Sequence, residues 1–198
     1  MIIQVVVEMI GGRMKTLIIN GSSRIGGDTS ALVDELVKHL EGEVKVLTVE
    51  DHIEPCNDCR DCWEEKGCTL EDDFTDIYPY LYECDNLVIA SPVWFSALSG
   101  PSMNIGSRVQ YIYASNHIRK DPIEVKRKKG AVIFVGAEPG TEEIPFKTAR
   151  TMMKFMNVNR DELKVIKSMN TMELKACDDH VALNDAKEVA VWFNQTVE

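Results

Sequence analysis

Residues 14–30 read MKTLIINGSSRIGGDTS and carry a short apolar run into a segment rich in glycine and serine. The run Thr16–Asn20 is typical of a strand that is buried on both faces of a parallel sheet. Leucines at positions 32, 36 and 40 follow at helical spacing, so the segment between is predicted to turn from strand to helix. The stretch therefore predicts the first βα unit of an α/β protein.

The same alternation of apolar runs and amphipathic segments continues along the chain. Further strands are predicted over Val44–Val49, Leu87–Ser91, Ala131–Val135 and Leu163–Lys167. Helices are predicted over Asp72–Glu83, Pro101–His117, Pro145–Asn157 and a last segment that turns Ala182, Ala186, Val189 and Phe193 inward. Five such units with right-handed crossovers give a three-layer α/β/α sandwich around a parallel sheet. We expect one domain over residues 14–198 and an N-terminal extension over residues 1–13, with the native start at Met14.

Composition excludes several classes of protein. The 198 residues include 22 Lys and Arg against 32 Asp and Glu, a net charge of −10, so nucleic acid is not an expected partner. No signal peptide is recognisable, and no apolar stretch reaches the roughly 20 residues of a membrane span. We therefore expect a cytoplasmic protein with no membrane partner, in which clustered cysteines indicate metal or redox chemistry.

The loop Gly21–Ser30 has the composition of a phosphate site. Ligands of open parallel sheets bind at the carboxyl ends of the strands, where this loop lies. Its glycines free backbone N–H groups, its hydroxyls donate hydrogen bonds, Arg24 supplies positive charge, and the following helix adds its dipole. The loop lacks the lysine of a nucleoside triphosphate loop and the G-x-G-x-x-G pattern, which favours a phosphate monoester. The alternative is a simple turn in which Asp28 or Thr29 caps the helix.

Two ordered motifs resemble a known family. The segment MKTLIINGSSR at 14–24, followed by GDT at 27–29, and DNLVIASPVWF at 85–95 resemble the NAD(P)H-dependent FMN reductases and their iron–sulfur flavoprotein relatives. The resemblance covers residues 14 to about 110 well and the rest loosely. It implies a flavodoxin-like fold with strand order 2-1-3-4-5, FMN as cofactor, NAD(P)H as a transient co-substrate, and a homo-dimer or tetramer.

The implied FMN contacts fall on three loops. The phosphate contacts are Ser22, Ser23, Arg24, Thr29 and Ser30; the ring is bordered by Pro92, Val93, Trp94 and Phe95; Gly136 and Ala137 close its other side. Core filling is the alternative role for the two aromatic rings. No side chain is expected to act as a catalytic acid or base, because a flavin needs only to be positioned and tuned.

Two regions depart from the family pattern. Asp28 stands where the family commonly has asparagine, and a carboxylate beside a phosphate is unfavourable unless it turns away to cap the helix. After the second motif, the family's lysine and Asp–Arg pair align with Met103, Ser107 and Arg108, so only the arginine is kept. Family-type contacts from that helix are therefore in question.

Four of the six cysteines lie close together, as Cys56, Cys59, Cys62 and Cys68. This C-x2-C-x2-C-x5-C spacing can ligate a [4Fe–4S] cluster, and also tetrahedral zinc, so both stay open alongside free thiols or a disulfide. Three evenly spaced cysteines lean towards iron, because structural zinc usually has two separated pairs. Acidic residues around the loop should lower the potential of any cluster. The remaining Cys84 and Cys177 are expected to be packing residues.

These observations support three functions. The first is an FMN-dependent NAD(P)H oxidoreductase that passes electrons to a small molecule or a ferredoxin-like protein. The second is an electron carrier in which a [4Fe–4S] cluster on the cysteine loop relays single electrons from FMN. The third is a zinc or thiol binding module without flavin.

Overall fold

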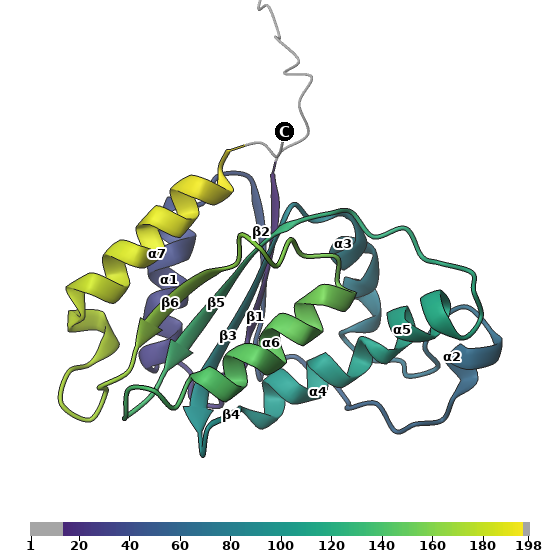
Figure 1. Ribbon diagram of the computed structural model, residues 1–198, viewed down its shortest axis with the longest axis horizontal. Coiled ribbons are helices and arrows are strands. Elements are labelled where there is room, and N and C mark those ends of the chain that lie inside the picture. The colour runs from purple at the N-terminus through teal and green to yellow at the C-terminus, as the bar shows by residue number, and fades with distance from the viewer. Residues whose placement is uncertain (1–13, 196–198) are drawn as a thin grey trace, which may run out of the picture.

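The computed structural model describes residues 14–195, so the predicted extension lies outside the described residues. Figure 1 shows the arrangement of the elements. The strands are β1 (Lys15–Asn20), β2 (Glu43–Leu47), β3 (Asn86–Trp94), β4 (Ala97–Leu98), β5 (Lys129–Val135) and β6 (Lys164–Ser168). The helices are α1 (Asp28–His39), α2 (Asp61–Glu64), α3 (Tyr78–Glu83), α4 (Gly100–Arg108), α5 (Gln110–His117), α6 (Glu143–Phe155) and α7 (His180–Phe193), with 3-10 turns η1 (Thr75–Ile77) and η2 (Ala176–Asp178).

Five parallel strands form the sheet in the order β2-β1-β3-β5-β6, which confirms the predicted fold and strand order. A sixth strand was not predicted. The short β4 turns back antiparallel on the end of β3, with Val93 opposite Leu98 and Trp94 opposite Ala97. Phe95 and Ser96 form the turn with φ of 52° and 55°, as a two-residue hairpin with the twist of its strands requires.

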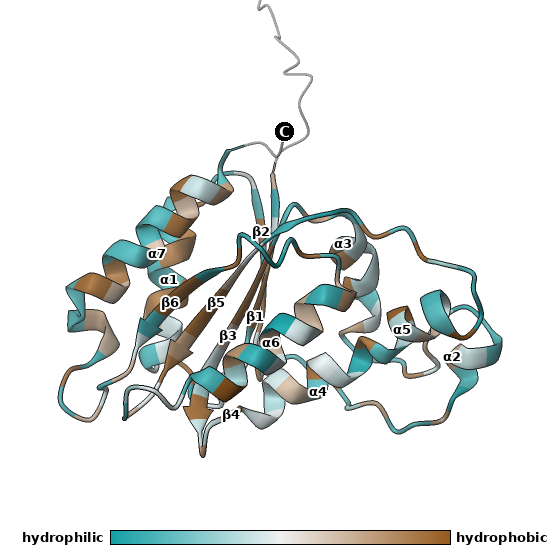
Figure 2. Cartoon of the chain, in the orientation of Figure 1, coloured by the Kyte–Doolittle hydropathy of each residue, from teal (hydrophilic) through white to brown (hydrophobic). Residues whose placement is uncertain are grey.

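The two faces of the sheet bury alternate residues of each strand. Leu17, Leu87 and Val132 face one layer, which contains α3, α4, α5 and α6. Ile18, Val88 and Ile133 face the other layer, which contains α1 and α7. Figure 2 shows the apolar strands between helices that turn polar residues outward. Burial on both faces explains why the strands read as continuous apolar runs.

The segment predicted as one helix over Pro101–His117 is two helices, α4 and α5. Between them Val109 donates its N–H to the Gly106 carbonyl and accepts from the Ile112 N–H, so the chain tightens into a 3-10 turn. The helix predicted over Asp72–Glu83 is also shorter. Asp72 accepts the Phe74 N–H with its side chain, and regular helix begins only with α3 at Tyr78.

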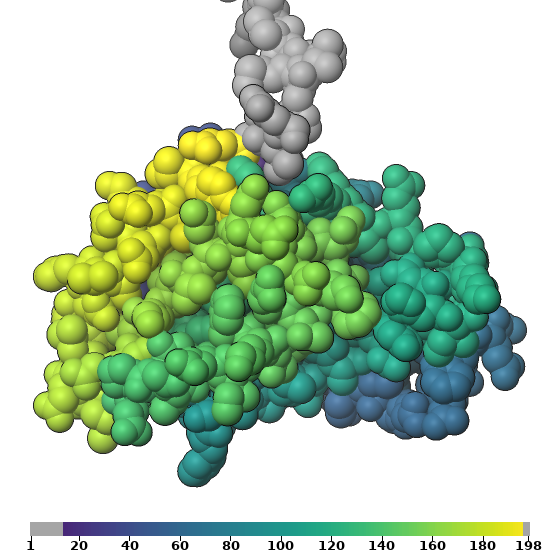
Figure 3. Space-filling model, in the orientation of Figure 1, coloured from purple at the N-terminus to yellow at the C-terminus, as the bar shows by residue number. Residues whose placement is uncertain are grey.

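The strands run downward in Figure 1, so their carboxyl ends meet along the lower edge of the sheet. The β3–β4 hairpin projects from this edge, as the space-filling view also shows (Figure 3). The cysteine loop follows β2 and packs through α2 against α5. No helix among the described residues is long and apolar enough to cross a membrane.

Candidate functional site

A pocket of about 290 Å³ opens at the carboxyl edge, between the loops that follow β1, β3 and β5. Nine of the eleven predicted FMN contacts line it: Ser22, Ser23, Arg24, Thr29, Pro92, Val93, Trp94, Gly136 and Ala137. Asp28, Val135 and Thr171 complete the lining. The three loops named from the sequence are therefore brought together around one cavity.

The loop after β1 presents unused donors to this pocket. No side chain caps the N-terminus of α1 at Gly27, so the first backbone N–H groups of that helix are left for another acceptor. The Ser22 hydroxyl accepts the Arg24 N–H at 3.2 Å and donates to the Arg24 carbonyl at 3.0 Å, which fixes the turn. An uncapped helix N-terminus of this kind favours an anion.

A network of serines supports the loop from below. The Ser99 hydroxyl donates to the Gly21 carbonyl at 2.6 Å and lies 3.0 Å from the Ser102 hydroxyl at the start of α4. The Ser91 hydroxyl accepts the Ser99 N–H at 3.0 Å. A Cβ at Gly21 would lie 1.9 Å from the Ser102 Oγ, so only glycine allows this close approach. The network therefore sets the height of the loop above the sheet.

Asp28 does not cap α1, in contrast to the alternative considered from the sequence. One carboxylate oxygen accepts the Ala176 N–H at 3.0 Å, and the other pairs with Arg24 Nη2 at 2.8 Å. Asp28 thus ties α1 to η2, 148 residues along the chain. It also partly neutralises Arg24, the cation expected to face a phosphate.

The second wall of the pocket comes from the end of β3. Pro92 and Val93 are half-buried there, and Trp94 leaves 53% of its surface exposed. Phe95 lies outside the pocket, because its place in the hairpin turn directs the whole side chain into solvent. Neither the Trp94 ring nor the Phe95 ring is buried in the core, which was the alternative role considered from the sequence. The prediction that Phe95 borders the ligand is therefore not supported within this chain.

Ser30 is the other predicted contact that lies outside the pocket. It is the third residue of α1, where helical geometry turns its side chain away from the loop. Its hydroxyl accepts a hydrogen bond from Asn20 Nδ2 at 3.3 Å, which joins α1 to the end of β1. Ser30 therefore supports the loop without facing the cavity.

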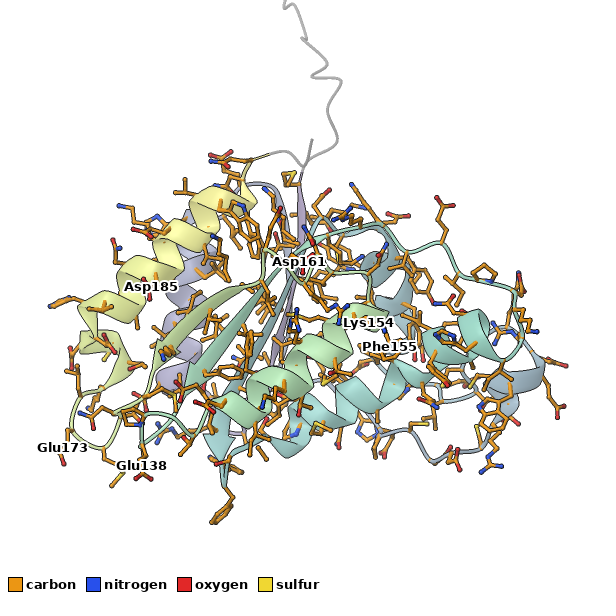
Figure 4. All side chains as sticks on the ribbon, in the orientation of Figure 1. Glu138, Lys154, Phe155, Asp161, Glu173 and Asp185 are labelled. Carbon is orange, nitrogen blue, oxygen red and sulfur yellow. The ribbon has the colours of Figure 1, made fainter. Side chains whose placement is uncertain are left out.

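The third wall joins the loops that follow β5 and β6. The Gly136 N–H donates to the Ser168 carbonyl at 3.0 Å, and the Gly136 carbonyl accepts from both the N–H and hydroxyl of Thr171. Thr171 lines the pocket and was missed, because no motif marks the loop after β6. Figure 4 shows Glu138 and Glu173 on these two loops, at the rim of the same edge.

Glu142 holds the loop after β5 in place. Its buried carboxylate accepts the Gly140 N–H at 2.7 Å and Lys167 Nζ at 2.8 Å. Burial opposes the charged form, but these bonds outweigh it, so the pKa of Glu142 is lowered. The carboxylate therefore stays charged and keeps Gly136 and Ala137 at the pocket.

The four predicted metal ligands also come together. Cys56, Cys59, Cys62 and Cys68 line one small cavity beside α4 and α5. The Cys56 N–H donates to the Ser107 hydroxyl at 2.9 Å, which anchors the loop to α4. Burial, together with the three neighbouring thiols, raises the pKa of Cys62.

The thiols do not converge on one point. Among the described residues, no three His, Cys, Asp or Glu side chains are close enough to hold a single metal ion. A mononuclear zinc site needs four sulfurs at about 2.3 Å from one centre, whereas the ligands of a cube each bind a different iron. Four cysteine sulfurs are a donor set that suits either a [4Fe–4S] cluster or tetrahedral zinc.

Two arginines beside these thiols have buried nitrogen atoms without hydrogen-bond partners among the described residues. Arg108 lines the cavity and pairs with the carboxylate of Asp72, yet its Nε and Nη2 are unused. Arg119 donates Nη1 to the Cys62 carbonyl, and its Nε and Nη2 are also unused. Unpaired buried donors are rare in proteins and indicate that an acceptor group belongs nearby.

The last two cysteines differ from each other. Cys84 is fully buried, as predicted, and burial raises its pKa to about 11. Cys177 is exposed in η2, so the prediction that it packs in the core is wrong. Of the three residues of η2, only Ala176 is buried, so the Cys177 side chain lies at the surface.

The fold and its pocket define the class: a flavodoxin-like α/β protein with a ligand pocket at the carboxyl edge of its sheet. The model of the family described as NADPH-dependent FMN reductase matches residues 14–162. The chain therefore belongs to this family of oxidoreductases. The matched region includes every predicted site residue and excludes Thr171.

Several curated relatives of this chain are named iron–sulfur flavoproteins. The chain is 30% identical over 140 residues to an iron–sulfur flavoprotein of Methanocaldococcus jannaschii, covering 68% of each protein. A second iron–sulfur flavoprotein of that organism is 29% identical over 128 residues, which is 63% of each chain. The iron–sulfur flavoprotein of Methanosarcina thermophila is 24% identical over 152 residues, 74% of each. This chain therefore covers less than two thirds of the length of the relative that is 29% identical to it.

Solved structures support the fold. The NAD(P)H:quinone oxidoreductase from Methanothermobacter marburgensis superposes with a TM-score of 0.68 at 14% identity, over 94% of this chain and all of that one. An FMN-dependent NADH-azoreductase from Bacillus anthracis, solved in complex with FMN, gives a TM-score of 0.63 at 13% identity. That match covers 92% of this chain and 100% of the azoreductase.

Proposed function

We propose that this chain binds FMN in the pocket between the loops after β1, β3 and β5, oxidises NAD(P)H, and passes the electrons to an acceptor. The observation that carries the proposal is the pocket itself. It combines an uncapped helix N-terminus, which suits a phosphate, with an apolar wall, which suits a flat ring system. Family membership supports the same ligand.

Two groups of residues would hold FMN, one at its phosphate and one at its ring. The phosphate would lie at the N-terminus of α1, near Ser22, Ser23 and Thr29, and the ring would lie beside Pro92–Trp94. When bound, FMN supplies the hydride and electron chemistry, so the chain needs no acid or base of its own. Because no dinucleotide motif is present in the sequence, NAD(P)H would bind transiently against the flavin face.

Activity tests this proposal directly. Protein supplied with FMN is expected to oxidise NADH or NADPH in the presence of a quinone or a ferricyanide acceptor, at a rate well above free FMN alone. Trp94→Ala, which removes part of the ring wall, should reduce the rate. Val191→Ala is the control, since this exposed apolar residue of α7 lies outside the pocket. No oxidation above free FMN would overturn the proposal.

Asp28→Asn is expected to tighten FMN binding by about threefold to tenfold. The change removes a negative charge from the phosphate site and frees Arg24, while an asparagine oxygen can still accept the Ala176 N–H. A partly screened charge interaction of this kind is worth about 1 kcal/mol. Fluorescence titration measures the effect, with the exposed Asp34→Asn of the same helix as control. Unchanged or weaker binding in Asp28→Asn contradicts this role.

A specific observation favours a second function, that of an iron–sulfur electron carrier. Four cysteine side chains line one cavity, and unused arginine donors lie beside it. Helix α4 joins the two sites: Ser99 at its start holds the phosphate loop, and Ser107 near its end holds Cys56. Ser107 is eight positions after Ser99, which corresponds to roughly 12 Å along the helix. A cluster on the cysteine loop would therefore stand close to the flavin pocket.

Iron and acid-labile sulfide in anaerobically prepared protein test this second function. We expect about four of each per chain, with loss of both in Cys62→Ser. A ferredoxin-like protein or a small molecule would then be the electron acceptor. If the protein binds FMN but takes up no iron, the oxidoreductase function is still supported and the iron–sulfur carrier function is contradicted.

We also infer assembly into a homo-dimer or tetramer. Trp94, Phe95 and Met172 are large apolar side chains exposed near the pocket, at 53%, 105% and 80% of their surface. Contact with a second copy would remove them from water. Light scattering should give a mass of at least twice the chain, and Phe95→Ser should lower it. A wild-type monomer would contradict the inference.

A further inference from the structure

Arg119 carries a charge that its surroundings do not balance. The residue follows α5, and its backbone N–H donates to the Ala114 carbonyl at 2.9 Å. The side chain turns toward the cysteine loop, where Nη1 donates to the Cys62 carbonyl. Nε and Nη2 are both buried and donate to no protein group among residues 14–195. A guanidinium is charged at all ordinary pH values, so Arg119 is a partly buried cation with two buried nitrogen atoms that lack a partner.

The other arginine of this region shows what is missing. Arg108 is more deeply buried than Arg119, but it is paired with the carboxylate of Asp72 and lies over the ring of Phe74. Within the described part of the chain, no carboxylate lies within ion-pair distance of Arg119. Burial of an unpaired charge costs several kcal/mol, so an anion is expected at this position.

The nearest candidate for that anion is the cysteine loop itself. Arg119 Nη1 donates to the Cys62 carbonyl, so the guanidinium lies directly against this loop. Helices α2 and α5, which carry Cys62 and lead into Arg119, pack against each other (Figure 1). Three acidic side chains of the region have partners other than Arg119: Asp58 pairs with Arg60, Asp121 pairs with Lys66, and Asp61 accepts the Thr69 hydroxyl.

We propose that Arg119 is the buried counter-cation of an anionic centre formed by the thiolates of Cys56, Cys59, Cys62 and Cys68 around an iron–sulfur cluster. This inference rests on the second function proposed above. Four thiolates outweigh the positive charge of the cluster core, and adding an electron makes the centre more negative still. A cation held in a region of low dielectric then stabilises the reduced form and raises the reduction potential. Arg119 is thus a positioning residue, which sets the potential through Cys62.

Redox titration of the reconstituted protein tests the assignment. Cluster reduction by dithionite, followed by electron paramagnetic resonance, gives the midpoint potential of each variant. In Arg119→Gln we expect the equilibrium constant for one-electron reduction to fall at least tenfold, which lowers the potential by about 59 mV. Arg119→Lys keeps the charge and should stay within threefold of wild type.

Arg60→Gln is the matched control. Arg60 also lines the cysteine cavity, but its side chain is 58% exposed and already pairs with Asp58. Solvent and salt screen such a charge, so its loss should change the reduction constant by less than threefold. Iron and sulfide content, together with FMN affinity, show that each variant is folded and loaded.

Three results would overturn the proposal. These are an unchanged potential in Arg119→Gln, an equal shift in Arg60→Gln, and zinc in place of iron and sulfide in the wild-type protein. FMN binding is measured on the same samples. A protein that takes up FMN but no iron would contradict this inference and leave the proposed flavin site unaffected. If Arg119→Gln does not fold, the midpoint potentials of Arg119→Met and Arg119→Lys provide the same comparison between an uncharged and a charged side chain.

Discussion

Asp72→Asn is expected to lower the free energy of unfolding by about 3 kcal/mol. Asp72 accepts three hydrogen bonds: Oδ1 from the Phe74 N–H, and Oδ2 from the Glu54 N–H and Arg108 Nη1. In asparagine the amide NH2 must face one of these sets of donors. The change also leaves Arg108 as an unpaired buried cation, and losing one partner of such a pair costs about 3–5 kcal/mol.

Urea denaturation measures this loss, and Asp76→Asn is its control. Asp76 lies in the adjoining 3-10 turn but is exposed, so its substitution should change the free energy of unfolding by under 0.5 kcal/mol. Equal stability of the Asp72 and Asp76 variants would mean that the pair with Arg108 contributes nothing. The cysteine loop should loosen in Asp72→Asn, because Arg108 also holds the Glu54 carbonyl ahead of that loop.

The same residue predicts a pH dependence. Burial opposes the charged form of Asp72, but hydrogen bonds from Arg108, Glu54 and Phe74 outweigh it, so its pKa is lowered from 3.8. A carboxyl group with a lowered pKa stabilises the fold above its unfolded pKa, and this stabilisation is lost as pH falls through the folded value. The stability gap between wild type and Asp72→Asn should therefore be complete above about pH 4, narrow as the pH falls below that value, and close below the lowered pKa.

Gly21→Ala should weaken FMN binding by more than tenfold and lower stability by about 1–3 kcal/mol. The new methyl group would lie 1.9 Å from Ser102 Oγ and 2.7 Å from Ser99 Oγ, so the phosphate loop must lift off α4. Forcing extra atoms into a well-packed site has this typical cost. A displaced loop no longer presents the N-terminus of α1 at the same height above the pocket.

Two further variants separate this steric effect from a general glycine effect. Gly100→Ala adds the same methyl group into open space at the first residue of α4, and should leave FMN affinity unchanged. Gly21→Ala combined with Ser102→Ala removes the closest contact and should recover part of the affinity. FMN affinity in Gly21→Ala equal to wild type would contradict the role of the serine network.

The fold was predictable because its signals are local. Continuous apolar runs such as Thr16–Asn20 mark strands buried on both faces, whereas the strand order was implied by the resemblance to a known family. The loop Gly21–Ser30 could be recognised as part of a ligand pocket for the same reason, since its residues adjoin in sequence. The hairpin that removes Phe95 from the pocket was not, because its two residues have the positive φ usually taken by glycine or asparagine.

Long-range contacts set the limit of sequence reasoning. Asp28 reads as a helix cap, yet its partner Ala176 lies 148 residues away. Thr171 enters the pocket only because the loop after β6 binds Gly136. Arg119 lies 57 residues from Cys62 and carries no motif, so its link to the cysteine loop requires the packing of α2 on α5.

The central claim is that the uncapped N-terminus of α1 and its serine-rich loop bind the phosphate of FMN. Calorimetric titration of the apoprotein with FMN and with riboflavin, which differ only in that phosphate, tests it most directly. We predict one FMN per chain and an affinity at least 100-fold higher than that for riboflavin. Equal affinity for the two flavins, or no binding of either, would contradict the claim.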